Sequence, residues 1–237
     1  MIDVLSYLEE RREEFLRHLK VARMLESRID ESFDEGGDPI EVRHVNTVKS
    51  GLLIHLYNIV EAITTRTLET AGRTIVGERP ALWKKQVLNE WIRSEIWNGE
   101  ERIGDGALKR LTDFGLTLAS GECPPKFSIK GEPGSWNDKS IKKVATRLGC
   151  DLILSAQVSR GAYEPTYRNE TTALEYLANR RNSIAHGSST FEEGAYDLTL
   201  HEIDELANKI LPYLKEVSIS YREYLKNKRY LKHGEVA

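Results

Sequence analysis

An arginine and a histidine near the end of one segment are the side chains best suited to phosphate chemistry. Arg181 and His186 stand five positions apart in the stretch RNSIAHG. Arginine is permanently charged, and its planar fork of donors matches phosphate oxygens. His186 precedes Gly187 at the end of an expected helix, where the negative end of the helix dipole favours the protonated imidazole. The pair therefore indicates proton transfer beside a phosphate group.

Other common catalytic patterns are missing from the sequence. The stretch HEIDE, residues 201–205, has Glu205 where a zinc protease needs its second histidine, and no Gly-Lys-Ser/Thr phosphate loop or Gly-x-Ser-x-Gly elbow is present. Cys123 and Cys150 lie far apart and form no Cys-x-x-Cys pair. We therefore expect no metal, no cofactor and no disulfide framework.

The spacing of Arg181 and His186 also bears on assembly. Five positions correspond to about 140° on a helix, so the two side chains do not share a face of one straight helix. They can converge where two copies of the helix meet about a two-fold axis, which predicts a homodimer with a composite site. The alternative is structural, because a surface arginine and a histidine before a glycine cap also occur by chance.

The elements that must position these residues are helices. Charged residues make up 30% of the chain and aromatic residues 8%, and apolar residues recur at three-four spacing, which predicts an all-α fold. The last helix should begin at Thr199, with Glu202 completing a capping box. The five expected helices cover about residues 3–34, 45–63, 80–97, 169–187 and 199–225.

The second of these helices is apolar nearly all round, so its polar residues are informative. His55, Asn58, Glu61 and Thr65 follow one face at spacings of three, three and four. Asn58 and Glu61 are secondary site candidates, since a carboxylate could hold Arg181 or fix the imidazole tautomer. A solvated strip, or a structural ion pair for Glu61, explains them equally well.

Residues 98–168 have a looser pattern, which we interpret as an irregular insertion within a single domain spanning 1–237. It should contain a short helix at about 139–148 and a short extended piece at 127–129. Lys142, Lys143 and Arg147 on that helix could guide RNA, although simple solvation is the expectation we favour for such a charge run.

Charge and hydropathy limit the partners. The net charge of -3 gives no global basic surface, so any nucleic-acid contact must be local. The N-terminus lacks the apolar core of a secretory signal, and the longest apolar run falls short of the roughly 20 residues of a membrane span. We expect a soluble, cytoplasmic protein without a membrane partner.

The stretch RNSIAHG resembles the signature of the HEPN superfamily, in which an arginine, a polar residue and a histidine lie on a late helix of an all-α bundle. LYNIVE at 56–61 and SSTFEEGAYDLT at 188–199 extend the resemblance, which is closest to stand-alone bacterial HEPN-like nucleases with a long N-terminal helix. It covers nearly the whole chain. It implies an antiparallel bundle with long N- and C-terminal helices.

The resemblance also implies metal-independent endoribonuclease activity that leaves 2′,3′-cyclic phosphate and 5′-hydroxyl ends. His186 would be the general acid or base, Arg181 would stabilise the transition state, and Asn182 would orient the arginine or a phosphate. Arg180 is a second phosphate contact or the alternative arginine. DNA is disfavoured as a substrate because the reaction needs a 2′-hydroxyl.

Such nucleases resemble toxins or antiphage effectors, so the implied partners are RNA, a second copy of the chain, and an antitoxin or a nucleotide-hydrolysing sensor encoded nearby. Two other functions stay open. One is a non-catalytic HEPN module that binds a nucleotide or a partner protein such as a nucleotidyltransferase. The other is a structural helical adaptor.

Overall fold

The computed structural model describes residues 2–29, 39–96, 105–131, 135–167 and 170–232. Within those ranges every regular element is helical, as expected, and the only β-type pairings are two isolated bridges. The elements are α1 (Ile2–Glu26), α2 (Val42–Ile75), a 3-10 helix η1 (Pro80–Leu82), α3 (Lys85–Ile96), α4 (Asp105–Ser120), α5 (Asp138–Leu148), α6 (Ala156–Tyr163), α7 (Ala173–Ala185) and α8 (Leu200–Lys226).

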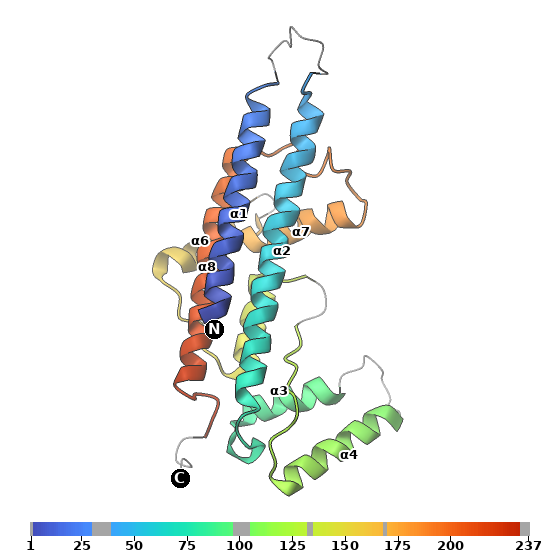
Figure 1. Ribbon diagram of the computed structural model, residues 1–237, viewed down its shortest axis with the longest axis vertical. Coiled ribbons are helices and arrows are strands. Elements are labelled where there is room, and N and C mark those ends of the chain that lie inside the picture. The colour runs from blue at the N-terminus through green and yellow to red at the C-terminus, as the bar shows by residue number, and fades with distance from the viewer. Residues whose placement is uncertain (1, 30–38, 97–104, 132–134, 168–169, 233–237) are drawn as a thin grey trace.

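Three long helices form the body of the molecule. α1 runs antiparallel to α2 and α8, and the three lie side by side for most of their length (Figure 1). The inner face of α1 buries Leu8, Phe15, Leu19 and Ala22 at the expected three-four spacing, and its first turn buries Val4. α1 ends at Glu26, before the expected boundary at residue 34, and residues 30–34 lie outside the described ranges.

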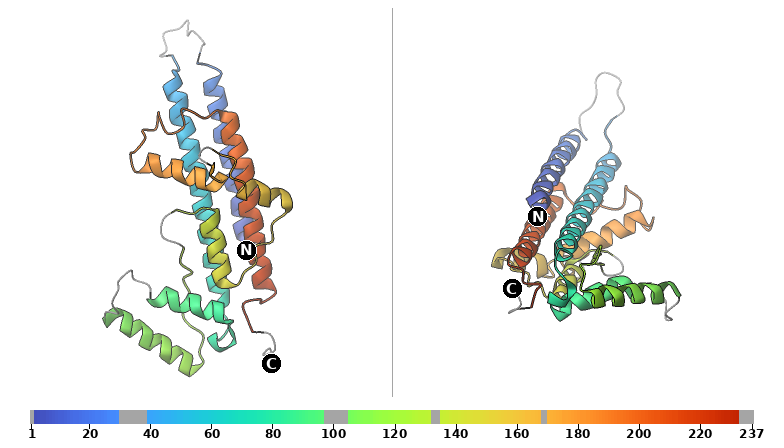
Figure 2. Two further views of the ribbon diagram at one scale, coloured as in Figure 1. Left: turned by 180° about the vertical axis from the view of Figure 1, so that it is seen from behind. Right: turned by 60° about the horizontal axis from the view of Figure 1, so that its bottom comes forward.

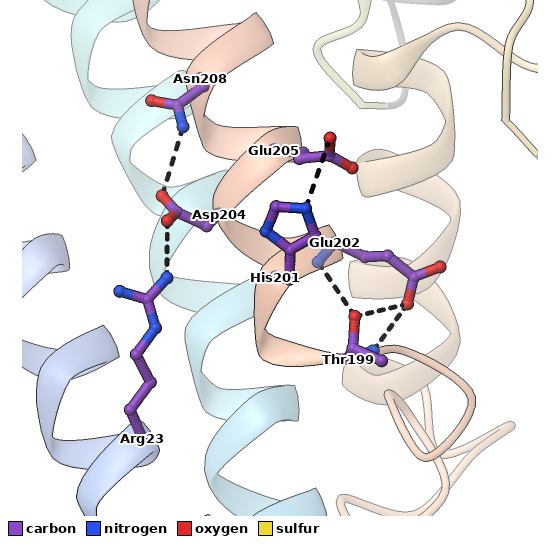
Figure 3. A network of polar contacts seen from close by, with 7 residues as sticks. All are labelled: Arg23, Thr199, His201, Glu202, Asp204, Glu205 and Asn208. Atoms are coloured by element: carbon purple, nitrogen blue, oxygen red, sulfur yellow. Dashed lines mark hydrogen bonds and ion pairs between the residues drawn. The ribbon is translucent and has the colours of Figure 1, made fainter.

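The start of α8 agrees with the sequence. Thr199 is the N-cap, its hydroxyl accepts a hydrogen bond from the backbone N–H of Glu202, and the Glu202 carboxylate accepts one from the backbone N–H of Thr199 at 2.7 Å (Figure 3). One turn later, Asp204 accepts a hydrogen bond from Arg23 of α1 at 2.6 Å. The capping box therefore fixes the beginning of α8 where α1 packs against it.

The expected helix over 80–97 is divided. η1 ends at Leu82, Trp83 is extended, and α3 begins only at Lys85. Tertiary packing explains the break, because Trp83 is fully buried between two other aromatic rings. Its ring centroid lies 5.4 Å from that of Trp91 and 5.9 Å from that of Phe127, on which it stacks. The prediction of one continuous helix was wrong here.

The insertion is more helical than expected. α4 was not predicted, and it packs on α3 (Figure 2). The centroid of the Phe114 ring lies 4.4 Å from that of the Trp91 ring. α5 agrees with the expected helix and is capped by Asn137. The expected extended piece at 127–129 forms no strand; it lies across α2 at Gly72, where any Cβ would collide with the carbonyl of Phe127.

One charge of α5 is not solvated. Lys142 and Lys143 are exposed, but the Arg147 side chain is only 14% exposed and pairs with Glu90 at 2.9 Å. Burial raises the pKa of Glu90, while Arg147 and Arg93 act in the opposite direction. Solvation was therefore the wrong expectation for Arg147, which joins α5 to α3.

None of the described helices is long and apolar enough to cross a membrane.

Candidate functional site

α7 carries the Arg-Asn-His motif in its last turns. Its N-cap is Thr172, whose hydroxyl accepts a hydrogen bond from the backbone N–H of Glu175 and donates one to Asp138 at 2.6 Å. The helix therefore begins at Ala173, later than the expected start at about residue 169. The helix ends as predicted, with His186 as the C-cap and Gly187 in the left-handed region at a φ of 73°. Arg181 and His186 are therefore held at a defined helix end.

The Arg181 guanidinium is directed towards α2. Its central carbon lies 4.8 Å from the centroid of the buried Tyr57 ring, a cation–π distance. One guanidinium nitrogen lies 3.4 Å from a carboxylate oxygen of Glu61, and the other donates to the side-chain oxygen of Asn182 at 3.2 Å. Arg181 is thus oriented from three sides while about a quarter of its side chain, 27%, remains exposed.

Asn182 is fixed by the insertion. Its amide nitrogen donates to the Ser135 hydroxyl at 2.7 Å, and that hydroxyl donates to the Asn182 oxygen at 3.1 Å. The next residue, Trp136, donates its backbone N–H to the Tyr57 hydroxyl at 2.8 Å. Two adjacent residues of the insertion therefore hold the site: Ser135 binds Asn182 of the motif, and Trp136 binds Tyr57.

His186 has a different environment. Its backbone N–H donates to the carbonyl of Asn182 at 2.9 Å, and its imidazole is exposed and makes no hydrogen bond or ion pair within the described residues. The loop that follows is held by a Ser183–Ser189 hydroxyl contact of 2.8 Å. The Arg181 side chain thus contacts α2, whereas the His186 side chain faces solvent. This divergence agrees with their angular separation on the helix.

Comparison with known protein families matches residues 5–230 to the family described as HEPN_MAE_28990-like HEPN. The chain belongs to this HEPN family. No curated protein and no solved structure matches the chain. HEPN membership indicates a nuclease-like or nucleotide-binding module.

The two adjacent arginines of this HEPN chain have different surroundings. Arg180 donates to Asp197 at 2.6 Å, and its guanidinium lies 5.2 Å from the centroid of the Tyr176 ring. Lys49 of α2 donates to the carbonyl of Leu198 at 2.7 Å. Arg180 therefore helps to fasten the loop between α7 and α8, whereas Arg181 faces α2.

The polar residues along one face of α2 lie in two different environments. His55 faces α1, with its ring nitrogens 3.7 Å from Glu14 and 3.1 Å from His18. Asn58 and Glu61 instead line a groove of about 710 Å³. We call this the Glu61 groove; it is also lined by Thr65, Arg66, Glu69, Arg73 and Trp136. Both secondary candidates from α2 therefore line one groove, and the HEPN motif arginine is linked to it through its contact with Glu61.

Three supports of the HEPN motif were not anticipated: Tyr57, Ser135 and Trp136. Tyr57 lies within LYNIVE, and a tyrosine inside an otherwise apolar helix needs a partner for its hydroxyl, which was the available signal. Ser135 and Trp136 carry no such local signal. Among the described residues, no three His, Cys, Asp or Glu side chains cluster as metal ligands.

Proposed function

We propose that the chain is a metal-independent endoribonuclease. The observation that supports this function best is the placement of Arg181, which is held by Tyr57, Glu61 and Asn182 with 27% of its side chain exposed. The exposed His186 lies on the same final turns of α7. An oriented cation and an accessible imidazole are the two groups that phosphodiester cleavage needs. The HEPN family match supports the same reading.

In the proposed reaction the ribose 2′-hydroxyl attacks the adjacent phosphorus. The 2′-oxygen–phosphorus bond forms, the bond from phosphorus to the 5′-oxygen of the next nucleotide breaks, and the products carry a 2′,3′-cyclic phosphate and a 5′-hydroxyl. His186 takes the 2′-hydroxyl proton while water protonates the leaving oxygen, or it gives a proton to the leaving oxygen while water takes the 2′-hydroxyl proton. Arg181 stabilises the charge that develops on the phosphate oxygens, and Asn182 keeps the guanidinium in place.

A two-fold dimer would complete this site. Arg181 faces α2 and His186 faces solvent, so two copies of α7 meeting about an axis would present an arginine from one chain and a histidine from the other in a shared groove. Light scattering should give a dimer mass. A monomer that is stable and fully active would overturn the composite site.

We further propose a cellular role and domain organisation. The family match extends across the insertion, which supports one HEPN-like domain over residues 1–237. The enzyme would act in the cytoplasm as a toxin or antiphage effector, restrained by an antitoxin or a nucleotide-hydrolysing sensor. Expression of wild type should arrest growth, and expression of folded His186→Ala protein should not.

The direct test is incubation of purified protein with total RNA in EDTA, followed by assay for 2′,3′-cyclic phosphate ends. Wild type should cleave, and His186→Ala and Arg181→Ala should lose at least about a hundredfold of the rate. His201→Ala is the matched control, because the His201 side chain is 80% exposed on α8. Nucleotide or protein binding without cleavage would favour the non-catalytic HEPN module.

A further inference from the structure

A second groove continues from the Glu61 groove along α2. It has a volume of about 590 Å³ and lies between the C-terminal half of α2 and residues 125–131 of the insertion. We call it the Lys126 groove. The two grooves share four lining residues, Thr65, Glu69, Arg73 and Trp136. A chain placed at Glu61, the contact of Arg181, can therefore continue into the Lys126 groove over one surface.

The charge of the Lys126 groove differs from that of the whole chain. Among the described residues, Arg73, Lys126 and Lys130 line it together with one carboxylate, that of Glu69, although the chain carries a net charge of -3. Both lysine side chains are exposed and make no hydrogen bond or ion pair among the described residues. This local excess of cations is suited to consecutive phosphates of a polyanion.

The groove also offers an aromatic surface. Trp136 is half-buried, and its ring packs so closely over Gly131 that a Cβ there would lie 2.7 Å from a ring carbon. Phe127 and Ile129 add apolar lining. Cations that follow a backbone, together with an aromatic face for a base, are the combination found where proteins bind single strands. A duplex keeps its bases stacked inside and offers none to such a surface.

The walls of the groove are fixed before any ligand binds. The absence of a side chain at Gly72 lets the backbone at Phe127 lie directly on α2, and the carbonyl of Lys130 accepts a hydrogen bond from Arg147. Trp136 is tied through its backbone to the Tyr57 hydroxyl. A preformed site loses less conformational entropy on binding.

We propose that the Lys126 groove binds the single-stranded RNA that adjoins the cleaved phosphate. Arg73, Lys126 and Lys130 contact its phosphates, and one base stacks on Trp136. Because Trp136 is shared with the Glu61 groove, the same residue sets the direction in which the strand leaves the reaction centre. This inference rests on the proposed ribonuclease function for the identity of its ligand.

The test measures binding apart from cleavage. A fluorescently labelled single-stranded RNA with methylated 2′-hydroxyls has no nucleophile, so its anisotropy reports affinity alone. The double variant Lys126→Glu/Lys130→Glu should bind at least about tenfold more weakly than wild type, and the slope of log affinity against log salt should fall by about 1.4, or about 0.7 for each lost contact. The control Lys20→Glu/Lys215→Glu reverses two exposed lysines that line neither groove and should bind within about twofold of wild type.

The outcomes separate the two proposals. Wild-type affinity in the Lys126→Glu/Lys130→Glu protein, no binding by wild type, or equal affinity for a duplex would each overturn the Lys126 groove as a single-strand site. If the protein cleaves RNA but its binding does not depend on Lys126 and Lys130, the proposed ribonuclease function stands and the proposed role of the groove is overturned. If binding depends on Lys126 and Lys130 but no RNA is cleaved in the EDTA assay, the groove stands as a single-strand site and the proposed ribonuclease function is overturned.

Discussion

The guanidinium carbon of Arg181 lies 4.8 Å from the centroid of the Tyr57 ring, and the hydroxyl at the edge of the same ring accepts the backbone N–H of Trp136 at 2.8 Å. One buried tyrosine thus supports the motif arginine on its face and the insertion at its edge. Small changes at Tyr57 should therefore affect stability and the site separately.

Tyr57→Phe should keep the aromatic face under Arg181 and leave the Trp136 N–H without its acceptor. We expect the free energy of unfolding to fall by about 1 to 2 kcal/mol, the cost of an unsatisfied donor in a partly buried place. Urea denaturation followed by circular dichroism measures the change. Tyr196→Phe removes a hydroxyl from a side chain that is 65% exposed and should alter stability by less than about 0.5 kcal/mol. Equal stability of the two variants would contradict the role of the Tyr57 hydroxyl.

Arg180→Ala should mainly lower stability, whereas Arg181→Ala should mainly lower the cleavage rate. Arg180→Ala removes the 2.6 Å pair with Asp197, in which the two side chains are 23% and 15% exposed, and should lower the free energy of unfolding by about 1 to 2 kcal/mol. Its cleavage rate, measured well below the melting temperature, should stay within about threefold of wild type. Arg181→Ala should lose cleavage with little loss of stability. The reverse pattern would identify Arg180 as the phosphate-binding arginine.

Two glycines of α2 offer a matched pair of substitutions. Gly72→Ala places a methyl group against the carbonyl of Phe127, so the insertion must move, and we expect a loss of about 1 to 3 kcal/mol. Gly51→Ala meets nothing within 4 Å and should stabilise the helix by about 0.5 to 1 kcal/mol. Melting temperatures that change in the same direction would show that 125–131 does not rest on α2 as described.

His55 should make stability depend on pH. Burial is the main cause that lowers the pKa of His55, His18 and Arg11 act in the same direction, and Glu14 opposes them. The folded chain therefore favours the neutral ring, and below the ordinary value of 6.5 the unfolded chain binds more protons. The stabilisation is fully present above pH 6.5 and declines as the pH falls towards the lowered pKa.

The melting temperature of wild type should accordingly fall between about pH 7.5 and about pH 5.5, and His55→Gln should fall less over the same interval. His201→Gln is the control, because its imidazole is 80% exposed and should leave the wild-type dependence unchanged. Parallel curves for wild type and His55→Gln would place the pH response elsewhere.

Local signals were sufficient for several parts of the fold. The capping box of Thr199 and Glu202 and the glycine after His186 mark helix ends through contacts between residues close in sequence, so they were predicted at the right positions. The three-four spacing in α1 likewise gave its buried face. These features also place the Arg-Asn-His motif at the end of a helix.

Long-range packing decided the remainder. Trp83 interrupts a helical pattern because its ring stacks on Phe127, which lies far along the chain. No residue close to Trp83 in sequence predicts that contact. The Tyr57–Trp136 bond joins positions 79 residues apart. α4 was missed because the glycines at its start indicate a loop, while its packing on α3 stabilises a helix.

The contacts of Ser135 and Trp136 limit how this site can be transplanted. A graft of RNSIAHG alone into another helical bundle would carry the arginine, asparagine and histidine without the hydroxyl that holds the Asn182 amide. A shortened chain that joined α2 directly to α7 would lose the same hydroxyl and would leave Tyr57 unbonded. The smallest transferable unit therefore comprises α2, residues 135–137 and α7, so part of the insertion belongs to the scaffold of the motif.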